Sequence, residues 1–149
     1  MVRDLEVALT HWLGLGIGPW NIWNFDAERL PQRTYQGRVG TFEAVVALCS
    51  IGPLTYELIE PVAGPSIWDD FLRDRGPGMH HFGYYVDDID GAITAMEAKG
   101  YPVVQSGAGF GVDGDGAFAY FDTTSAYGCY YEAILGPRAL PDPDRHVPL

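Results

Sequence analysis

The sequence predicts an α+β domain built from two tandem copies of one βαβββ unit. Two observations predict this class: an internal repeat that contains a helix with its start and stop signals, and strand-like runs that follow each copy of that helix. Length agrees, because 149 residues suit one domain with a real hydrophobic core. Nearly half of the residues are apolar and no low-complexity run interrupts the chain, so disorder is not expected.

The repeat is a gapless match between residues 2–10 (VRDLEVALT) and residues 86–94 (VDDIDGAIT). Asp4 and Asp88 stand where a helix N-cap belongs, and apolar residues recur at helical spacing after each. Gly16 and Gly100 lie at equivalent places past the two helices, where a C-terminal glycine is typical. Each half is therefore predicted to carry a similar helix of about three turns.

Strand-like runs rich in Val, Tyr, Phe and Ile are separated by Gly, Pro and Asp clusters. They cover 20–25, 41–49 and 54–60 in the first half, and 102–105, 117–122 and 128–134 in the second. A clear strand (79–86) precedes the second helix, and 65–75 has the pattern of a short amphipathic helix. The predicted single domain, 1–149, thus divides into a first module (1–62), a linker helix (63–78), a second module (79–137) and a Pro-rich tail (138–149).

The first module lacks most of the strand that precedes its helix, because only Met1 and Val2 stand in that place. By the register of the repeat, the counterpart of His81 would fall just upstream of Met1. We therefore expect the natural chain to be longer at this end.

Composition restricts the partners. The formal net charge of −11 argues against nucleic acid, which needs basic patches, and counts mildly against heavily phosphorylated ligands such as coenzyme A. No export signal is visible, and no apolar stretch approaches the ~20 residues that span a membrane, so we expect a cytoplasmic protein without a membrane partner. Cys49 and Cys129 form no CxxC pair and are expected to be buried thiols.

Two glutamates, Glu57 and Glu132, occupy the same position in the two copies, each within an apolar and aromatic strand. Burying a carboxylate there is costly unless it is paired or binds a metal. His81 begins the strand that opens the second copy, and strand alternation should turn its neighbour His80 to the opposite face. If copy-related strands meet around a pseudo-twofold axis, one nitrogen and two oxygens converge, which suits Mn, Co, Ni, Zn or Fe(II). The alternatives are solvated glutamates and a structural histidine.

These motifs resemble those of the vicinal oxygen chelate proteins, which include methylmalonyl-CoA epimerases and glyoxalase I. Residues 78–90 (GMHHFGYYVDDID) resemble the family's G-x-H-H stretch, and 56–61 (YELIEP) resemble its I-E-L strand. Residues 130–134 (YYEAI) resemble its final ligand-bearing strand, and 16–20 (GIGPW) resemble its helix exit. The resemblance covers essentially the whole chain and implies a curved, barrel-like mixed sheet around a central cleft.

The resemblance also implies a function. It assigns one divalent metal ion to Glu57, His81 and Glu132, with a fourth ligand, a first-strand histidine, that this sequence lacks. It implies an isomerase, epimerase or lyase in which the metal, as a Lewis acid, stabilises an enolate of a small carbonyl substrate. A carboxylate then moves the proton, either Glu132 or Glu57, with Glu43 as a weaker candidate.

Five residues are predicted to surround the substrate, which favours a small apolar or aromatic compound: Trp20, Trp23, Asn24, Tyr85 and Tyr120. Core packing is the alternative for the aromatic ones. The second functional hypothesis is a metal-free protein that sequesters a small molecule, like the bleomycin-binding members of this fold. A ring-cleaving dioxygenase is less favoured, because those enzymes use two histidines and one carboxylate. We expect a homodimer, because open sheet edges need cover.

Overall fold

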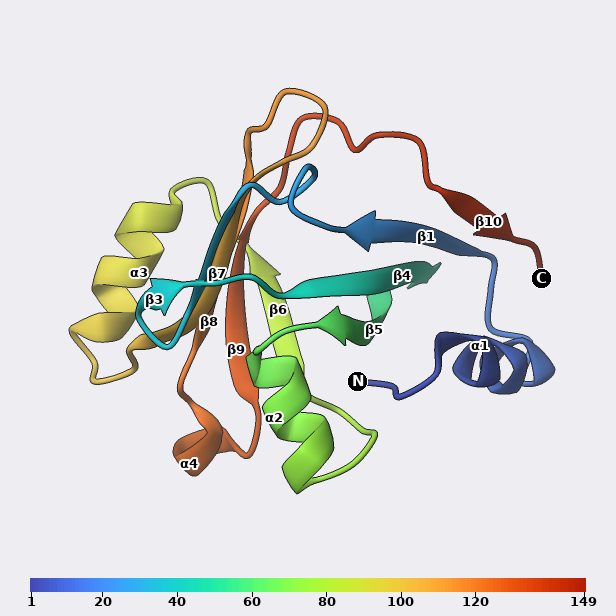
Figure 1. Ribbon diagram of the computed structural model, residues 1–149, viewed down its shortest axis with the longest axis horizontal. Coiled ribbons are helices and arrows are strands. Elements are labelled where there is room, and N and C mark those ends of the chain that lie inside the picture. Colours follow the sequence, from blue (N-terminus) through green and yellow to red (C-terminus); the bar gives the residue numbers. More distant parts are fainter.

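The structure, a computed structural model that describes all 149 residues, has two β-sheets with helices outside them (Figure 1). A four-stranded sheet has the order β10-β1-β4-β5, and a six-stranded sheet has the order β3-β2-β7-β8-β9-β6. The helices are α1 (Leu5–Gly14), α2 (Ile67–Asp74), α3 (Ile89–Glu97) and α4 (Thr124–Tyr127). The strands are β1 (Trp20–Phe25), β2 (Gln32–Tyr35), β3 (Arg38–Val39), β4 (Glu43–Ile51), β5 (Leu54–Ala63), β6 (His81–Tyr85), β7 (Val103–Phe110), β8 (Gly116–Phe121), β9 (Tyr130–Leu135) and β10 (Arg145–Val147).

The two long repeat helices begin in the same way. The side chain of Asp4 accepts a hydrogen bond from Val7 N at the start of α1, and Asp88 accepts one from Gly91 N at the start of α3, each at 3.0 Å. These bonds satisfy backbone donors that the first helical turn leaves free. The capping prediction is therefore confirmed.

The same helices also end alike. Gly16 and Gly100 take positive φ angles of 75° and 86°. Each left-handed glycine lets the next residue bond back into the last turn, with Ile17 N donating to Trp12 O and Tyr101 N donating to Met96 O, both at 3.0 Å.

The segments that precede the two helices share their register as well. Strand β6 pairs in parallel with β9, and just beyond it Val86 N donates to Ile134 O at 2.9 Å. Val2 N donates to Ile59 O of β5 at 3.0 Å, which is the equivalent bond in the first copy. The predicted repeat is thus present in the backbone hydrogen bonds.

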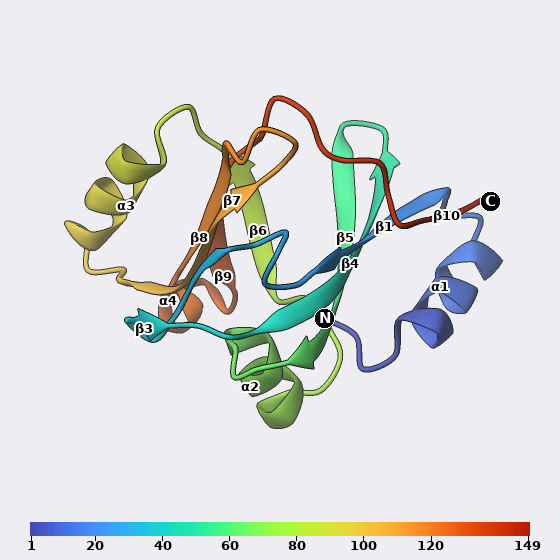
Figure 2. The same ribbon diagram turned by 45° about the horizontal axis from the view of Figure 1, so that its top comes forward.

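Each sheet packs one face against a helix and the other against the opposite sheet. Helix α1 covers the four-stranded sheet through a cluster that includes Leu5, Leu9 and Trp20, and α3 covers the outer face of β8 and β9 (Figure 2). The largest apolar cluster contains Phe42, Val46 and other residues that face the space between the sheets, together with residues of α2. None of the helices is both long enough and apolar enough to cross a membrane.

Three strands were absent from the sequence prediction. The hairpin β2–β3 belongs to the first half of the chain but pairs with β7 of the second, and β10 in the Pro-rich tail pairs with β1. The tail thereby crosses from one sheet to the other (Figure 2). It is held by Asp144, which accepts hydrogen bonds from Asn24 N at 2.8 Å and from Arg29 Nη1 and Nη2 at 2.5 and 2.6 Å.

Candidate metal centre

Glu57, His81 and Glu132 meet between the two sheets, with one potential ligand atom of each lying within 4.8 Å of the others. His81 Nε2 is 3.0 Å from Glu57 Oε2 and 3.4 Å from Glu132 Oε2. Glu57 comes from β5, an outer strand of the four-stranded sheet, whereas His81 and Glu132 come from β6 and β9 of the other sheet. The structure therefore brings together the three residues that the sequence predicted as metal ligands.

Strand alternation explains why Glu57 faces this space. Leu58, its neighbour on β5, packs into the α1 cluster, so Glu57 and Ile59 face the opposite sheet. Glu60 returns to the α1 side, where its carboxylate accepts a hydrogen bond from Leu5 N at 2.8 Å. Two glutamates three residues apart thus have separate roles on the two faces.

Glu132 lies in a cross-strand row between Tyr120 of β8 and Gly83 of β6. The glycine makes room for it, because a Cβ atom at position 83 would lie 3.1 Å from Glu132 Oε2 and 2.8 Å from Ile134 Cδ1. Tyr120 is 1% exposed and its ring lies 5.1 Å from that of His81. These neighbours enclose a carboxylate that is itself only 5% exposed.

The enclosure changes the acidity of the group. Burial raises the pKa of Glu132 to about 8, and the nearby Glu57 carboxylate acts in the same direction, against the opposing effect of His81. Burial lowers the pKa of His81, but the hydrogen bond to Glu57 and the charge of Glu132 outweigh it, so this pKa lies above its usual value. Burial also raises the pKa of Tyr120 well above that of a free tyrosine. Without a metal, the Glu132 carboxyl therefore holds its proton at neutral pH.

His80 differs from its prediction. It precedes β6 instead of belonging to the strand, so strand alternation does not turn it away from His81, and the Nδ1 atoms of the two rings lie 3.1 Å apart. His80 is 2% exposed, and its Nε2 atom has no hydrogen-bond partner. Burial and the charge of His81 lower the pKa of His80 to about 2, which keeps it neutral.

The donor set fits a small divalent cation. Two carboxylates and one imidazole are the ligand types that Zn, Mn, Co, Ni and Fe(II) accept. The buried Glu132 supports this, because a carboxylate with so little access to water is costly to ionise unless a cation compensates its charge. Glu57, the most exposed of the three with 27% of its side-chain surface accessible, gives the cluster an opening to solvent.

The predicted substrate residues do not all reach this cluster. Trp20 is fully buried in the α1 cluster on the outer face of its sheet, with its indole N–H bonded to Ile17 O. Trp23 is 8% exposed and donates to Pro141 O of the tail, while Asn24 bonds to Asp144. Core packing or contacts with the tail therefore occupy all three side chains. For the two tryptophans, this arrangement corresponds to the core-packing alternative.

The other candidates are distributed differently. Tyr120 contacts the cluster, whereas Tyr85, near the end of β6, is 76% exposed and lies next to Gly136. Glu43 begins β4 and pairs with Ala63, while Glu57 pairs with Leu48, five residues further along the same strand. The structure therefore places Glu43 apart from the three converging side chains.

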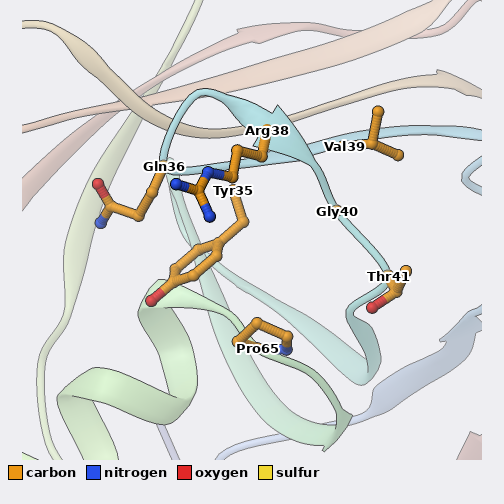
Figure 3. Close-up of a pocket in the computed structure, with 7 residues that line it drawn as sticks. All are labelled: Tyr35, Gln36, Arg38, Val39, Gly40, Thr41 and Pro65. Carbon is orange, nitrogen blue, oxygen red and sulfur yellow. The ribbon is translucent and has the colours of Figure 1, made fainter.

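A separate cavity of about 280 Å³ lies at the β2–β3 hairpin (Figure 3). Arg38 is the charged side chain in its wall, and the Tyr35 hydroxyl bonds to Asp70 of α2 at 2.6 Å. No histidine or carboxylate belongs to its lining, so it lacks the groups for metal-assisted chemistry.

Sequence reasoning missed two residues that shape the centre, Gly83 and the role of His80. Gly83 interrupts an aromatic strand, and a glycine in that position is a signal for close approach of another group. For His80, the adjacent histidines were a signal, but assigning both to one strand hid their contact.

Comparisons with known proteins place the chain in a family and a fold. Residues 1–121 match the family model described as the glyoxalase/bleomycin resistance protein/dioxygenase superfamily. A comparison with curated proteins finds no match.

Three solved structures illustrate the likeness in fold. A hypothetical protein from Bacillus halodurans is 21% identical, with a TM-score of 0.66, over 95% of this chain and 92% of that one. The methylmalonyl-CoA epimerase of Mycobacterium tuberculosis is 22% identical, with a TM-score of 0.58, over 94% and 83% of the two chains. A variant of the Streptomyces coelicolor methylmalonyl-CoA epimerase, in complex with 2-nitronate-propionyl-CoA, is 16% identical, with a TM-score of 0.65, over 95% and 92%. The predicted fold class is confirmed.

Proposed function

The chain belongs to the glyoxalase/bleomycin resistance protein/dioxygenase superfamily, and on this premise we propose that it is a divalent-metal-dependent isomerase or epimerase that acts on a small carbonyl compound. The observation that carries the proposal is the convergence of Glu57, His81 and Glu132 within 4.8 Å. Two of these residues are repeat-equivalent, and the third comes from the strand that opens the second copy.

Glu57, His81 and Glu132 would hold the ion. When bound, the metal would supply a Lewis acid for a substrate carbonyl oxygen. The two carboxylates differ in surroundings, because Glu132 is enclosed by Tyr120 and Gly83 whereas Glu57 is partly open to solvent. This difference favours separate roles for the two acids.

Glu132 is the better candidate for proton transfer. A positioned carboxylate in an enclosed place is a suitable general base, and Glu132 is the more enclosed of the two, with 5% of its surface exposed. The Tyr120 hydroxyl stays protonated beside it and can donate a hydrogen bond to an oxygen atom. In this assignment the carboxylate oxygen of Glu132 that does not hold the ion removes a proton next to the carbonyl and returns it.

Two observations favour this proposal over its alternatives. A metal-free binding protein would need an aromatic cleft, but Trp20 and Trp23 are buried with their indole N–H groups satisfied. Ring-cleaving dioxygenases use two histidines and one carboxylate, whereas this cluster has two carboxylates and one histidine.

Proton exchange tests the proposal without knowledge of the natural substrate. The protein is loaded with Zn²⁺, Mn²⁺ or Co²⁺ and incubated in D₂O with a panel of small 2-substituted carbonyl compounds. The panel includes acyl-CoA thioesters and short thioesters that lack the nucleotide. We expect metal-dependent loss of the α-proton signal in the NMR spectrum of at least one panel member.

Two variants sharpen the result. Glu132→Gln should lower the exchange rate by roughly 10²–10⁴-fold, the usual contribution of a positioned base. Glu60→Gln is the matched control, because Glu60 lies on the opposite face of β5 and bonds to α1. Exchange that persists in EDTA, or an equal loss in both variants, would contradict the proposal.

A further inference from the structure

The ring of His80 is buried in a place where an apolar side chain would fit. It packs between Phe71 and Tyr130, with ring centroids at 5.1 and 4.7 Å, and it is 2% exposed. Its Nε2 atom has no hydrogen-bond partner. A buried polar atom without a partner destabilises a fold, so a histidine here calls for a reason other than packing.

The reason lies at its other nitrogen. His80 Nδ1 is 3.1 Å from His81 Nδ1, so one of these two atoms must carry a proton and the other a lone pair. His81 Nε2 faces the carboxylates of Glu57 and Glu132 at 3.0 and 3.4 Å. To ligate a metal at that end, His81 must carry its proton on Nδ1.

We propose that His80 is a positioning residue for His81: its Nδ1 atom accepts a hydrogen bond from His81 Nδ1–H and leaves His81 Nε2 directed at the two carboxylates. The inference rests on the proposed metal site and adds the group that orients His81, the nitrogen ligand of the three converging residues. His80 then carries its own proton on Nε2, the atom without a partner. In this tautomer the Nε2–H group of His80 is therefore the buried donor that has no acceptor.

The hydrogen bond can be tested by ¹⁵N NMR in the metal-free protein at a pH where His81 carries protons on both ring nitrogens, so that its Nε2–H faces Glu57 and its Nδ1–H faces His80. We expect a scalar coupling between the two Nδ1 atoms, with the shared proton attached to His81 and the proton of His80 on Nε2. A proton attached to His80 Nδ1, or no coupling in a folded sample, would overturn the proposal. This measurement needs neither a variant nor activity.

Zn²⁺ affinity, measured by competition with a chelator, tests the consequence. His80→Phe keeps an aromatic ring but removes the acceptor, and it should weaken Zn²⁺ binding roughly 10–100-fold. His80→Asn places an amide oxygen near the same point and should recover most of that loss. Phe71→Leu disturbs the packing of the same ring without removing the acceptor. It should leave the affinity within about threefold of the parent, a smaller loss than that expected when a ligand histidine loses its hydrogen-bond partner.

The outcomes separate the two proposals. Parent-like affinity in His80→Phe, or an equal loss in Phe71→Leu, would refute a positioning role. A parent protein that binds no Zn²⁺, Mn²⁺ or Co²⁺ would refute the proposed function instead, while the NMR coupling would still decide whether His80 accepts a proton from His81.

Discussion

Replacing Glu132 by glutamine should change how the stability of the metal-free protein depends on pH. Burial raises the pKa of Glu132 from 4.5 to about 8, so the folded state holds a proton that the unfolded state releases over this range. The stabilisation is complete below pH 4.5, the unfolded value, and is lost as the pH rises through about 8. The raised pKa of His81 acts in the same direction from its ordinary value upward.

The size of the effect follows from the shift. Each pH unit between the two pKa values costs about 1.4 kcal/mol for one proton. Between pH 5 and pH 7.5, the free energy of unfolding of the metal-free parent should fall by roughly 3 kcal/mol. Glu132→Gln removes this titration and should show less than half of that fall. At pH 7.5 the variant should be the more stable protein, because it no longer has to keep an acid protonated inside the fold.

Urea unfolding in EDTA, followed by tryptophan fluorescence at several pH values, measures both quantities. Glu60→Gln serves as the control: it weakens the bond to Leu5 N at the start of α1 but should keep the pH dependence of the parent. A parent-like slope in Glu132→Gln would refute the reasoning, since the buried carboxyl would then not be the group that titrates.

Three further predictions concern the surroundings of the site. Gly83→Ala should weaken Zn²⁺ binding about tenfold while changing the unfolding free energy by less than about 1 kcal/mol, because the new Cβ would press on Glu132 Oε2; chelator competition and urea unfolding measure the two effects. Asp144→Ala should cost about 1–2 kcal/mol of unfolding free energy, because it releases Arg29 and the tail that joins the sheets; urea unfolding measures the loss. The edge strand β6 exposes Phe82 by 56%, so we predict a homodimer by light scattering at micromolar concentration, and Phe82→Glu should shift it towards monomer.

The repeat made the main features of the fold predictable. Asp4 and Asp88, with Gly16 and Gly100, mark helix ends through local hydrogen bonds that depend on few distant contacts. Such signals survive in a single sequence because their physics is local. The equivalent glutamates were predictable for the same reason, since equivalent strands place equivalent residues on the same face.

Features that depend on distant partners were not predictable. Strands β2 and β3 are short and largely exposed, without a buried face to create an alternating pattern, and β2 forms only because β7 lies beside it. Strand β10 likewise depends on the edge of β1. Pro-rich composition was a correct description of the tail, but composition does not say which sheet edge a tail will reach.

The aromatic residues show a different limit. Trp20 and Trp23 differ by three positions in one strand, so alternation alone turns them to opposite faces. The sequence could not reveal which face of the strand packs under α1. It also could not reveal that the Pro141 carbonyl accepts a hydrogen bond from the Trp23 indole. A residue's chemical type identifies a candidate for binding, whereas tertiary packing decides whether its side chain is free.

Anomalous diffraction from crystals grown with Zn²⁺ tests the central claim most directly, because it locates the ion without assumptions about substrate. We expect one peak per chain between the sheets, bonded to Glu57, His81 Nε2 and Glu132 at roughly 2.0–2.3 Å. A peak only at other residues such as His11 or His146, or no peak between the sheets at saturating Zn²⁺, would contradict it.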